Sequence, residues 1–325
     1  MIMNKIAIRY ILFILIGMVI LLFLLKEKSP FGKNNTSFAV KSGTEITRID
    51  LFQGDNRLSL QKSGKDWKVN RTKATRKSAV LFIIRALKEI KIKSPVSPEI
   101  FRNEIIGKGI IPVKVNVYER RKLVKSFYVY KTTSNTYGNI MKMKASSKPF
   151  IVFMPGYEDN IGTHFTLNEL FWQPYTVYNL LPSEIASIEL DNYNEAEASF
   201  RITNNKNRFS LSYSNGYLSG WDTSRVKRYV TYFTYIPFES WAFDLTGDEK
   251  KQIKSQPPLY RINVNKTGGG NIGLTIWEKW NLGDGKKNRD TDRVWAKLDE
   301  VNTIFIMRYF DIDPILKKKS YFFGD

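Results

Sequence analysis

The chain contains a single imidazole, His164, and this side chain is the natural candidate for a general base at neutral pH. A Ser-His-Asp arrangement would have to include it, with Asp159 close by in the sequence. No G-x-S-x-G sequence is present to supply the serine nucleophile. We therefore interpret His164 as an ordinary packing or surface residue, and a hydrolase that uses it is our third hypothesis for function.

The chain has no cysteine, and this excludes several classes of site. Disulfide frameworks, thiolate nucleophiles, iron–sulfur clusters and zinc sites built on cysteine all require that residue. With one histidine, a site of several histidines is excluded as well. We accordingly predict no catalytic, metal-binding or cofactor-binding residues.

A glycine-rich segment has the spacing of a nucleotide-binding loop, because Gly268, Gly270 and Gly273 form G-x-G-x-x-G after a predicted strand. A dinucleotide site needs a helix to begin there, since the helix amino terminus holds the pyrophosphate. Residues 274–277 (LTIW) instead have the composition of a strand. The glycines are therefore predicted to form a hairpin turn rather than a cofactor site.

Three aspartates, Asp284, Asp290 and Asp292, lie in residues 283–293 at spacings that could bind calcium. The stretch lacks the EF-hand order and its closing glutamate. It also carries four cations that would repel a metal ion, namely Lys286, Lys287, Arg289 and Arg293. We predict a solvated loop here.

Positive charge is concentrated in one part of the chain, which has a net charge of +20 overall. Residues 62–131 hold 19 Lys and Arg against 5 Asp and Glu, a net charge of +14. Such a surface attracts an acidic protein, anionic lipid, an acidic glycan or nucleic acid. No helix-turn-helix, RRM or zinc-finger sequence is present, so nucleic acid is not favoured. The candidate partner-binding residues are Arg76, Lys77, Arg85 and Lys88. The alternative is a solvated basic surface without a specific partner.

The amino terminus has the pattern of a membrane anchor, because residues 11–25 are apolar and uncharged. Extended to residues 6–25, with Arg9 near its end, the segment reaches the roughly 20 residues that a spanning helix needs. A cleaved signal peptide would need a small-x-small site, and none follows Leu25 directly. We predict an uncleaved anchor in residues 1–28 that binds the lipid bilayer through residues 6–25. A polar tether is predicted at 29–44.

The charges that flank the anchor lean toward a cytoplasmic carboxy-terminal domain. Lys5 and Arg9 precede it, and four lysines follow it, at positions 26, 28, 33 and 41. Long domains cross membranes largely regardless of such charges, so the count decides little.

The rest of the chain has the pattern of two similar halves, residues 45–183 and 184–325. Each half contains three short alternating segments, then two helical segments, then further strands. This order occurs twice, and the second occurrence begins about 140 residues after the first. In the first half, apolar spacing predicts a helix around 80–90, and we expect a second short helix around 98–106. In the second half, apolar spacing predicts a helix around 226–233, and a polar helix follows at 248–254. We predict an α+β fold from an internal duplication, each half an antiparallel sheet with helices on one face. The alternative is two unrelated α+β domains.

Two segments carry a resemblance to a known family: residues 44–70 (TEITRIDLFQGDNRLSLQKSGKDWKVN) and 171–190 (FWQPYTVYNLLPSEIASIEL). The first ends a strand pair in Trp67, and the second contains Leu181-Pro182-x-x-Ile185 before the second half. With the amphipathic helix and paired strands between them, they resemble the uncharacterised domain-of-unknown-function family 4340 over residues 44–323. The chain departs from that pattern at residues 107–109 (GKG), where the family has an aromatic-Gly-Leu step.

The resemblance implies a bacterial envelope protein with one membrane helix, beside ABC-type export or gliding-like components. It implies no catalytic residues, and it favours a domain outside the cytoplasm. We therefore predict a single-pass protein of the bacterial inner membrane with a periplasmic carboxy-terminal domain. Its predicted function is that of a non-enzymatic accessory or scaffolding subunit that binds other envelope membrane proteins. The alternative is a module that binds an anionic envelope polymer such as a cell-wall glycan. No small-molecule substrate is inferred.

Overall fold

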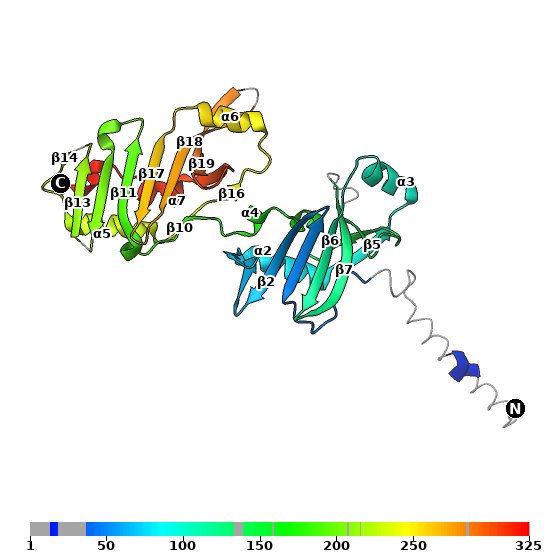
Figure 1. Cartoon of the computed structure of the whole chain (residues 1–325). Helices are drawn as coiled ribbons and strands as arrows, with labels where there is room; N and C mark the ends of the chain where they lie inside the picture. The colour runs from blue at the N-terminus through cyan, green and yellow to red at the C-terminus, as the bar shows by residue number, and fades with distance from the viewer. Residues whose placement is uncertain are drawn as a thin grey trace, which may run out of the picture. The chain divides into compact units, whose positions relative to one another are not determined.

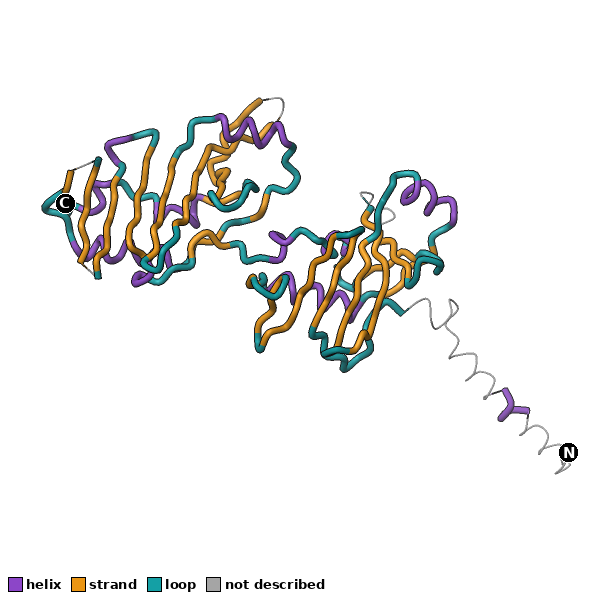
Figure 2. Tube along the Cα trace, in the orientation of Figure 1, coloured by secondary structure: helices purple, strands orange, loops and turns teal. Residues whose placement is uncertain are grey.

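The structure is a computed structural model that describes residues 14–18, 37–132, 139–157, 159–206, 208–214, 216–283 and 286–324. It contains two compact units, residues 1–174 (unit 1) and residues 175–325 (unit 2). The predicted α+β class is confirmed, because the described part of each unit forms a nine-stranded antiparallel sheet with helices packed on it (Figures 1 and 2). The division after Pro174 lies nine residues before the predicted start of the second half at 184.

The predicted anchor, residues 6–25, lies mostly outside the described residues, of which 14–18 are helical. No helix among the described residues is long and apolar enough to span a membrane. The described end of the predicted tether, residues 37–44, packs on unit 1. Phe38 is fully buried there with its ring 5.9 Å from that of Phe127, and the Val40 amide donates to the Leu87 carbonyl at 2.9 Å.

The sheet of unit 1 has the strand order β4-β3-β2-β1-β6-β7-β8-β9-β5. Its strands are β1 (Arg48–Gln53), β2 (Asn56–Ser63), β3 (Asp66–Val69), β4 (Lys73–Ala74), β5 (Lys91–Pro95), β6 (Val113–Glu119), β7 (Lys122–Lys131), β8 (Asn139–Lys142) and β9 (Phe150–Phe153). Its helices are α2 (Lys77–Glu89), α3 (Pro98–Phe101), the π-helix η1 (Arg102–Ile106), the 3-10 helix η2 (Ile161–His164) and α4 (Glu169–Trp172).

Helix α2 covers one face of this sheet, where Ile83 and Leu87 pack in the core with strand residues such as Leu51 (Figure 1). Helix α3 and η1 cover part of the opposite face, where Ile105 packs with Tyr130 and Ile140. The prediction of helices on one face only is therefore wrong for unit 1. Tyr130 and Ile140 are register partners on this second face, and burying their apolar surface requires a cover.

The sheet of unit 2 has the order β14-β13-β12-β11-β17-β18-β19-β20-β16. Its strands are β11 (Ile185–Asn192), β12 (Phe200–Asn205), β13 (Arg208–Tyr213), β14 (Gly216–Tyr217), β16 (Ser240–Trp241), β17 (Tyr260–Lys266), β18 (Asn271–Gly283), β19 (Lys286–Leu298) and β20 (Phe305–Arg308). A separate two-stranded sheet pairs β10 (Thr176–Tyr178) with β15 (Ile236–Pro237).

The helices of unit 2 are α5 (Thr223–Thr231), α6 (Gly247–Ser255) and α7 (Tyr309–Ile312). Its 3-10 helices are η3 (Pro182–Glu184), η4 (Ala196–Ala198), η5 (Tyr232–Thr234), η6 (Asp313–Ile315) and η7 (Lys319–Phe322). The buried Tyr229 of α5 packs its ring 5.4 Å from that of Phe200, while Ile253 of α6 packs with Trp277 of β18 and with Ile304.

The two nine-stranded sheets have the same order of strands when the strands of each sheet are numbered along the chain.

The charged segment 283–293 is not the solvated loop that we predicted. Most of it belongs to β19, which pairs with β18 from Gly283↔Lys286 to Leu274↔Leu298. The many charged residues led to the loop prediction. In the structure, however, Asp290 is only 7% exposed and Val294, further along β19, is fully buried. The predicted hairpin turn is confirmed for Gly268 and Gly270, since β17 and β18 pair as far as Asn265↔Asn271. It is wrong for Gly273, which lies within β18 opposite Asn263.

The outer strands of both sheets offer little room for a further strand. Strands β4, β14 and β16 have two residues each, so few backbone groups are available on them. The longer edge strand β5 carries Lys91, Lys93 and Pro95. Charged residues and proline at an edge oppose pairing with another chain.

Candidate functional site

Three of the four predicted partner-binding residues lie on one face of α2. The helix buries Val80, Ile83 and Leu87 against the sheet. Residues spaced three or four apart share a helix face, so Lys77, Leu81, Arg85 and Lys88 line the opposite, exposed side. We call these four residues the α2 face. Leu81 is 57% exposed in the middle of its three cations.

Arg76, the fourth predicted residue, has a different position. It is half-buried, and its amide donates to the Trp172 carbonyl at 2.6 Å. Its Nη2 donates to the Phe171 carbonyl at 3.2 Å, and its guanidinium lies 5.1 Å from the centroid of the Phe171 ring. Arg76 therefore attaches α4 to the start of α2 and is not part of the exposed basic surface.

The cations of the α2 face differ in their pairing. Arg85 Nε lies 3.0 Å from Glu89 Oε2, one turn further along the helix. Within the described residues, Lys77 and Lys88 have no ion-pair partner. Eleven residues at 1.5 Å each place these two lysines about 16 Å apart along the helix axis. The face thus offers two unpaired charges and an apolar side chain between them.

A pocket of about 360 Å³ lies beside the first turn of α2, between the helix and the β2–β3 and β3–β4 segments. Trp67, Val80 and Leu81 provide its apolar lining. Lys65, Lys68 and Lys77 also line it and are exposed. Leu81 and Lys77 belong to the α2 face too, so the pocket and the α2 face form one continuous surface.

The surface formed by the α2 face and the pocket lies in the more positively charged of the two units. Unit 1 has 30 Lys and Arg against 12 Asp and Glu, whereas unit 2 has 21 against 19. Their net charges are therefore +18 and +2. A surface with such an excess of one sign attracts anionic partners over several ångströms.

His164 is packed among aromatic rings of unit 1. Its ring centroid lies 4.1 Å from that of Phe82 and 5.8 Å from those of Tyr157 and Phe171. Burial lowers the pKa of His164, the charge of Arg76 lowers it further, and Asp159 partly opposes this. These surroundings therefore favour the neutral imidazole. The hydroxyl that lies near the ring among the described residues is that of Thr163, with Oγ1 3.3 Å from Nδ1.

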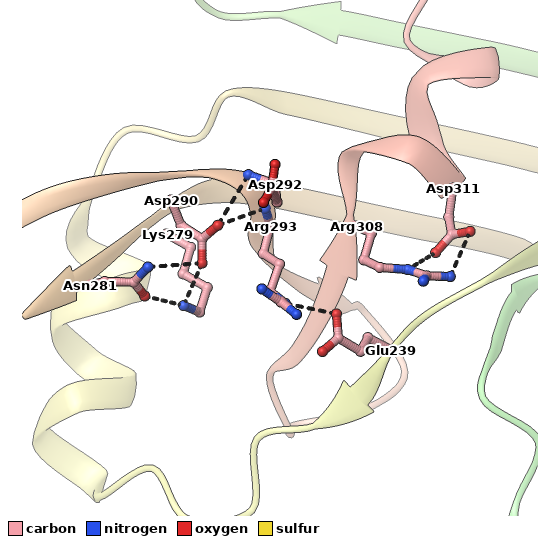
Figure 3. A network of polar contacts seen from close by, with 8 residues as sticks. All are labelled: Glu239, Lys279, Asn281, Asp290, Asp292, Arg293, Arg308 and Asp311. Atoms are coloured by element: carbon pink, nitrogen blue, oxygen red, sulfur yellow. Dashed lines mark hydrogen bonds and ion pairs between the residues drawn. The ribbon is translucent and has the colours of Figure 1, made fainter.

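The buried aspartate of the β18–β19 hairpin holds a lysine instead of a metal ion (Figure 3). Asp290 Oδ2 accepts from Lys279 Nζ at 2.8 Å and from Asn281 Nδ2 at 3.2 Å. Burial alone would raise the pKa of Asp290, but hydrogen bonds from Lys279, the Asp292 amide and Asn281 outweigh it and lower the pKa to about 2. One carboxylate oxygen of Asp290 is thus bound to the Lys279 ammonium. Asp284, the first aspartate of the calcium-like spacing, lies outside the described residues.

The neighbouring arginines in Figure 3 are paired with carboxylates as well. Arg293 Nε donates to Glu239 Oε2 at 2.8 Å, and Arg308 Nε donates to Asp311 Oδ2 at 2.8 Å. Within the described residues, no group of three or more His, Asp or Glu side chains is placed to hold a metal ion. The first pair joins β19 to the residue before β16, and the second joins β20 to α7.

The pocket includes residues that the sequence-based prediction missed. Lys65, Trp67 and Lys68 belong to a β-hairpin, and they join Lys77 and Leu81 only through the packing of α2 on the sheet. One signal was present in the sequence. Leu81 falls on the polar side of the helix predicted by Val80, Ile83 and Leu87. Single exposed apolar residues are common on protein surfaces, so this signal alone did not identify the pocket.

Comparisons of the chain with protein-family models, with curated proteins and with solved structures found no match. The resemblance to family 4340 therefore stays a prediction.

Proposed function

We propose that this chain is a non-enzymatic accessory or scaffolding subunit of a bacterial envelope complex. Residues 6–25 would anchor it in the inner membrane as a single-pass protein, with both units in the periplasm. ABC-type transport or gliding-like machinery is the class of complex that the resemblance to family 4340 implies. The observation that carries the proposal is the α2 face with its adjoining pocket, in the unit with a net charge of +18.

The mixture of side chains on this surface is typical of a protein-binding site. A partner that covers Leu81 and Trp67 removes apolar area from water, worth about 25 cal/mol per Å². Lys77 and Lys88 gain anionic partners that they do not have among the described residues. Arrangements of apolar anchors surrounded by charges account for specificity and fast association at protein interfaces.

The proposal is tested by affinity capture of the full chain from gently solubilised native membranes, with mass spectrometry of the recovered proteins. A triple variant, Lys77→Glu, Arg85→Glu and Lys88→Glu, should lower recovery of stoichiometric envelope partners at least tenfold. Arg76 is kept, because its replacement would disturb the attachment of α4. The matched control reverses Lys227 and Arg228, which are exposed on α5 of unit 2.

Equal recovery by the wild type and the triple variant would contradict docking through the α2 face. Recovery of the chain alone, under conditions that keep other membrane complexes intact, would contradict the subunit role itself. The second outcome would favour the anionic-polymer alternative.

The proposed location has a separate test, which uses the absence of native cysteine. Tyr217, 85% exposed on β14, can be replaced by Cys as a single reactive site. A membrane-impermeant maleimide should label Tyr217→Cys in cells whose outer membrane alone is permeabilised. Labelling that requires opening of the inner membrane would place the domains in the cytoplasm and contradict the proposal.

Binding of an anionic envelope polymer is the second candidate function. It is favoured by Lys77 and Lys88, which have no ion-pair partner among the described residues. It predicts that the purified chain is retained on an acidic cell-wall glycan and released by salt, because salt screens exposed charges. The α2-face triple variant should then elute at lower salt than the α5 control. Retention that ignores both salt and the triple variant would exclude this candidate.

We further propose that the two units derive from an internal duplication, as their shared strand order supports. The segments Ile49-Asp50-Leu51 and Ile188-Glu189-Leu190 occupy the same place, each between the second strand and the first strand after the helices. Experimental structures of the two units, superposed on their sheets, test this. A different strand order or register at these segments would count against a common origin.

A further inference from the structure

The pocket beside α2 has the size and position of a recognition site. Its volume of about 360 Å³ is within the range of about 300–1,000 Å³ that ligand pockets have. It is bordered by two elements that the chain brings together from residues 65–75 and 77–81. Trp67 is half-buried against the core of unit 1, so its indole is held in place as part of the pocket wall.

The lysines of the pocket lie on both of its borders. Lys65 and Lys68 come from the β2–β3 hairpin, and Lys77 comes from the first turn of α2. None of the three has an ion-pair partner among the described residues, and one acidic residue, Asp66, lines the pocket with them. An occupant with negative charge on two sides of an apolar group would therefore complement this site better than a neutral one.

The start of α2 adds to this preference, as a comparison with α5 makes plain. In unit 2 the carboxylate of Asp222 caps α5 and accepts from the Ser224 amide at 2.7 Å. In unit 1 the cap position of α2 is Arg76, without a side-chain cap, and no acidic residue is in the first turn. Helix amino termini favour negative charge, so α2 begins with Arg76 and Lys77 against that preference. Such local inconsistencies are typical of functional sites.

We propose that this pocket binds a large apolar side chain, aromatic or leucine-like, from an acidic segment of a partner protein. The side chain contacts Trp67, Val80 and Leu81, and acidic residues on either side of it pair with Lys65 or Lys68 and with Lys77. This inference rests on the proposed subunit function and names the chemistry of the partner. A single lipid headgroup would leave one of the two borders without an anion, which is why a peptide segment fits the site better.

The test uses the full chain in a non-ionic detergent as bait for a displayed library of random dodecapeptides. The selected peptides should share an aromatic residue or leucine flanked by Asp or Glu. Synthetic copies of one such peptide should lose affinity at least tenfold when its acids become amides or its apolar residue becomes alanine. Raising the salt concentration should also weaken binding, because part of the attraction is between exposed charges.

Two variants then locate the binding site. Ala74→Trp fills the pocket from its exposed border strand, and the triple variant Lys65→Glu, Lys68→Glu and Lys77→Glu reverses its lysines. Each should weaken the peptide at least tenfold, whereas the α5 control with Lys227→Glu and Arg228→Glu should bind as the wild type does. Circular dichroism and the melting temperature of each variant verify that it is folded.

Several outcomes would overturn the inference. The library could yield no acidic-apolar consensus, or the selected peptide could bind Ala74→Trp as tightly as the wild type. Vesicles of phosphatidylglycerol that bind through the pocket, without competition from the peptide, would assign the pocket to lipid. If peptides fail while the α2-face variant still loses its membrane partners, the pocket inference is wrong and the subunit function stands.

Discussion

In unit 1 the central strand β1 carries Asp50 between Ile49 and Leu51, and in unit 2 strand β11 carries Glu189 between Ile188 and Leu190. The apolar residues are buried in both sheets, with Ile49 opposite Leu60 and Ile188 opposite Ile202. The acidic residues differ. Asp50 is 1% exposed, whereas Glu189 is half-buried with Arg201 as its register partner.

The comparison shows that the apolar pattern and the polar pattern serve different purposes in this chain. Apolar residues at alternate positions define the sheet in both units, because a shift by one residue would expose them. The polar positions are free to differ. Unit 2 pairs cations such as Arg261, Arg293 and Arg308 with its own carboxylates, at 2.7, 2.8 and 2.8 Å, and is nearly neutral. Unit 1 retains a large excess of cations around α2.

The largest expected effect on stability concerns two buried aromatic residues, Trp172 of unit 1 and Phe322 of unit 2, which make equivalent backbone hydrogen bonds. The Trp172 carbonyl accepts from the Arg76 amide at 2.6 Å, and the Phe322 carbonyl accepts from the Asp222 amide at 2.7 Å. Both side chains are fully buried, Trp172 beside the start of α2 and Phe322 beside the start of α5. Trp172→Ala and Phe322→Ala should each lower the free energy of unfolding by about 3–5 kcal/mol.

Hydrogen exchange with mass spectrometry can assign each loss to its unit. Trp172→Ala should speed exchange in residues 37–174 and Phe322→Ala in residues 175–324. The double variant tests independence, because substitutions in separate units should add. Faster exchange across both units in either single variant would break the comparison.

The next effect concerns the two central acids. Asp50 Oδ1 accepts from Ser59 Oγ at 2.7 Å and Oδ2 from Arg57 Nη2 at 2.9 Å, and Arg48 Nε lies 3.5 Å away. Asp50→Ala removes these charged hydrogen bonds and should cost about 2–3 kcal/mol in urea unfolding. Glu189→Ala should cost less than about 1 kcal/mol, because Glu189 has no ion pair or side-chain hydrogen bond among the described residues. Equal losses would show that the two positions are energetically alike.

Acid should affect unit 2 through Asp290. Its pKa is about 2 in the folded chain against 3.8 in the ordinary state, so ionised Asp290 stabilises the fold. This stabilisation is present above pH 3.8 and is lost as the pH falls through about 2, and the shift corresponds to about 2 kcal/mol. Asp290→Asn should be less stable than the wild type at pH 6 and lose less stability between pH 4 and 2. If the stability of the wild type and of Asp290→Asn changed equally between pH 4 and 2, this role of Asp290 would be contradicted.

The smallest effect concerns unit 1 and occurs at a higher pH. The pKa of His164 is lowered, first by burial and then by the charge of Arg76. The stability that neutral His164 gives is therefore present above its ordinary pKa of 6.5 and is lost as the pH falls below it toward the folded-state pKa. NMR titration resolves this one imidazole directly. A pKa at or above 6.5 would contradict the packing, and His164→Gln should remove this part of the pH dependence of unit 1.

Much of the fold could be predicted from alternation and helical spacing. The strands at 113–118 and 185–190 and the helices at 98–106 and 248–254 were found within one or two residues of their bounds. Strand β19 was missed because its first half is charged and was therefore predicted to be a loop. In the structure β19 pairs with β18, and Lys279 of β18 neutralises the buried Asp290 of β19. Such neutralisation depends on which strands become neighbours, and the sequence does not show this locally.

The candidate site was predictable only in part, for a similar reason. Helical periodicity places Lys77, Arg85 and Lys88 on the exposed face, as the structure has them. The same argument placed Arg76 with them, but the hydrogen bonds of its backbone and side chain to α4 could not be inferred from spacing. The pocket combines residues of a hairpin and a helix, and only tertiary packing brings them together.

The short or charged edge strands of the two nine-stranded sheets affect how copies of this protein interact at high concentration. Exposed strands at the edge of a sheet can pair with those of another copy and lead to aggregation. Here β4, β14 and β16 are only two residues long, and Lys91, Lys93 and Pro95 occupy β5. Copies of the chain that meet at high concentration therefore have few free backbone groups on these edge strands through which to join their sheets.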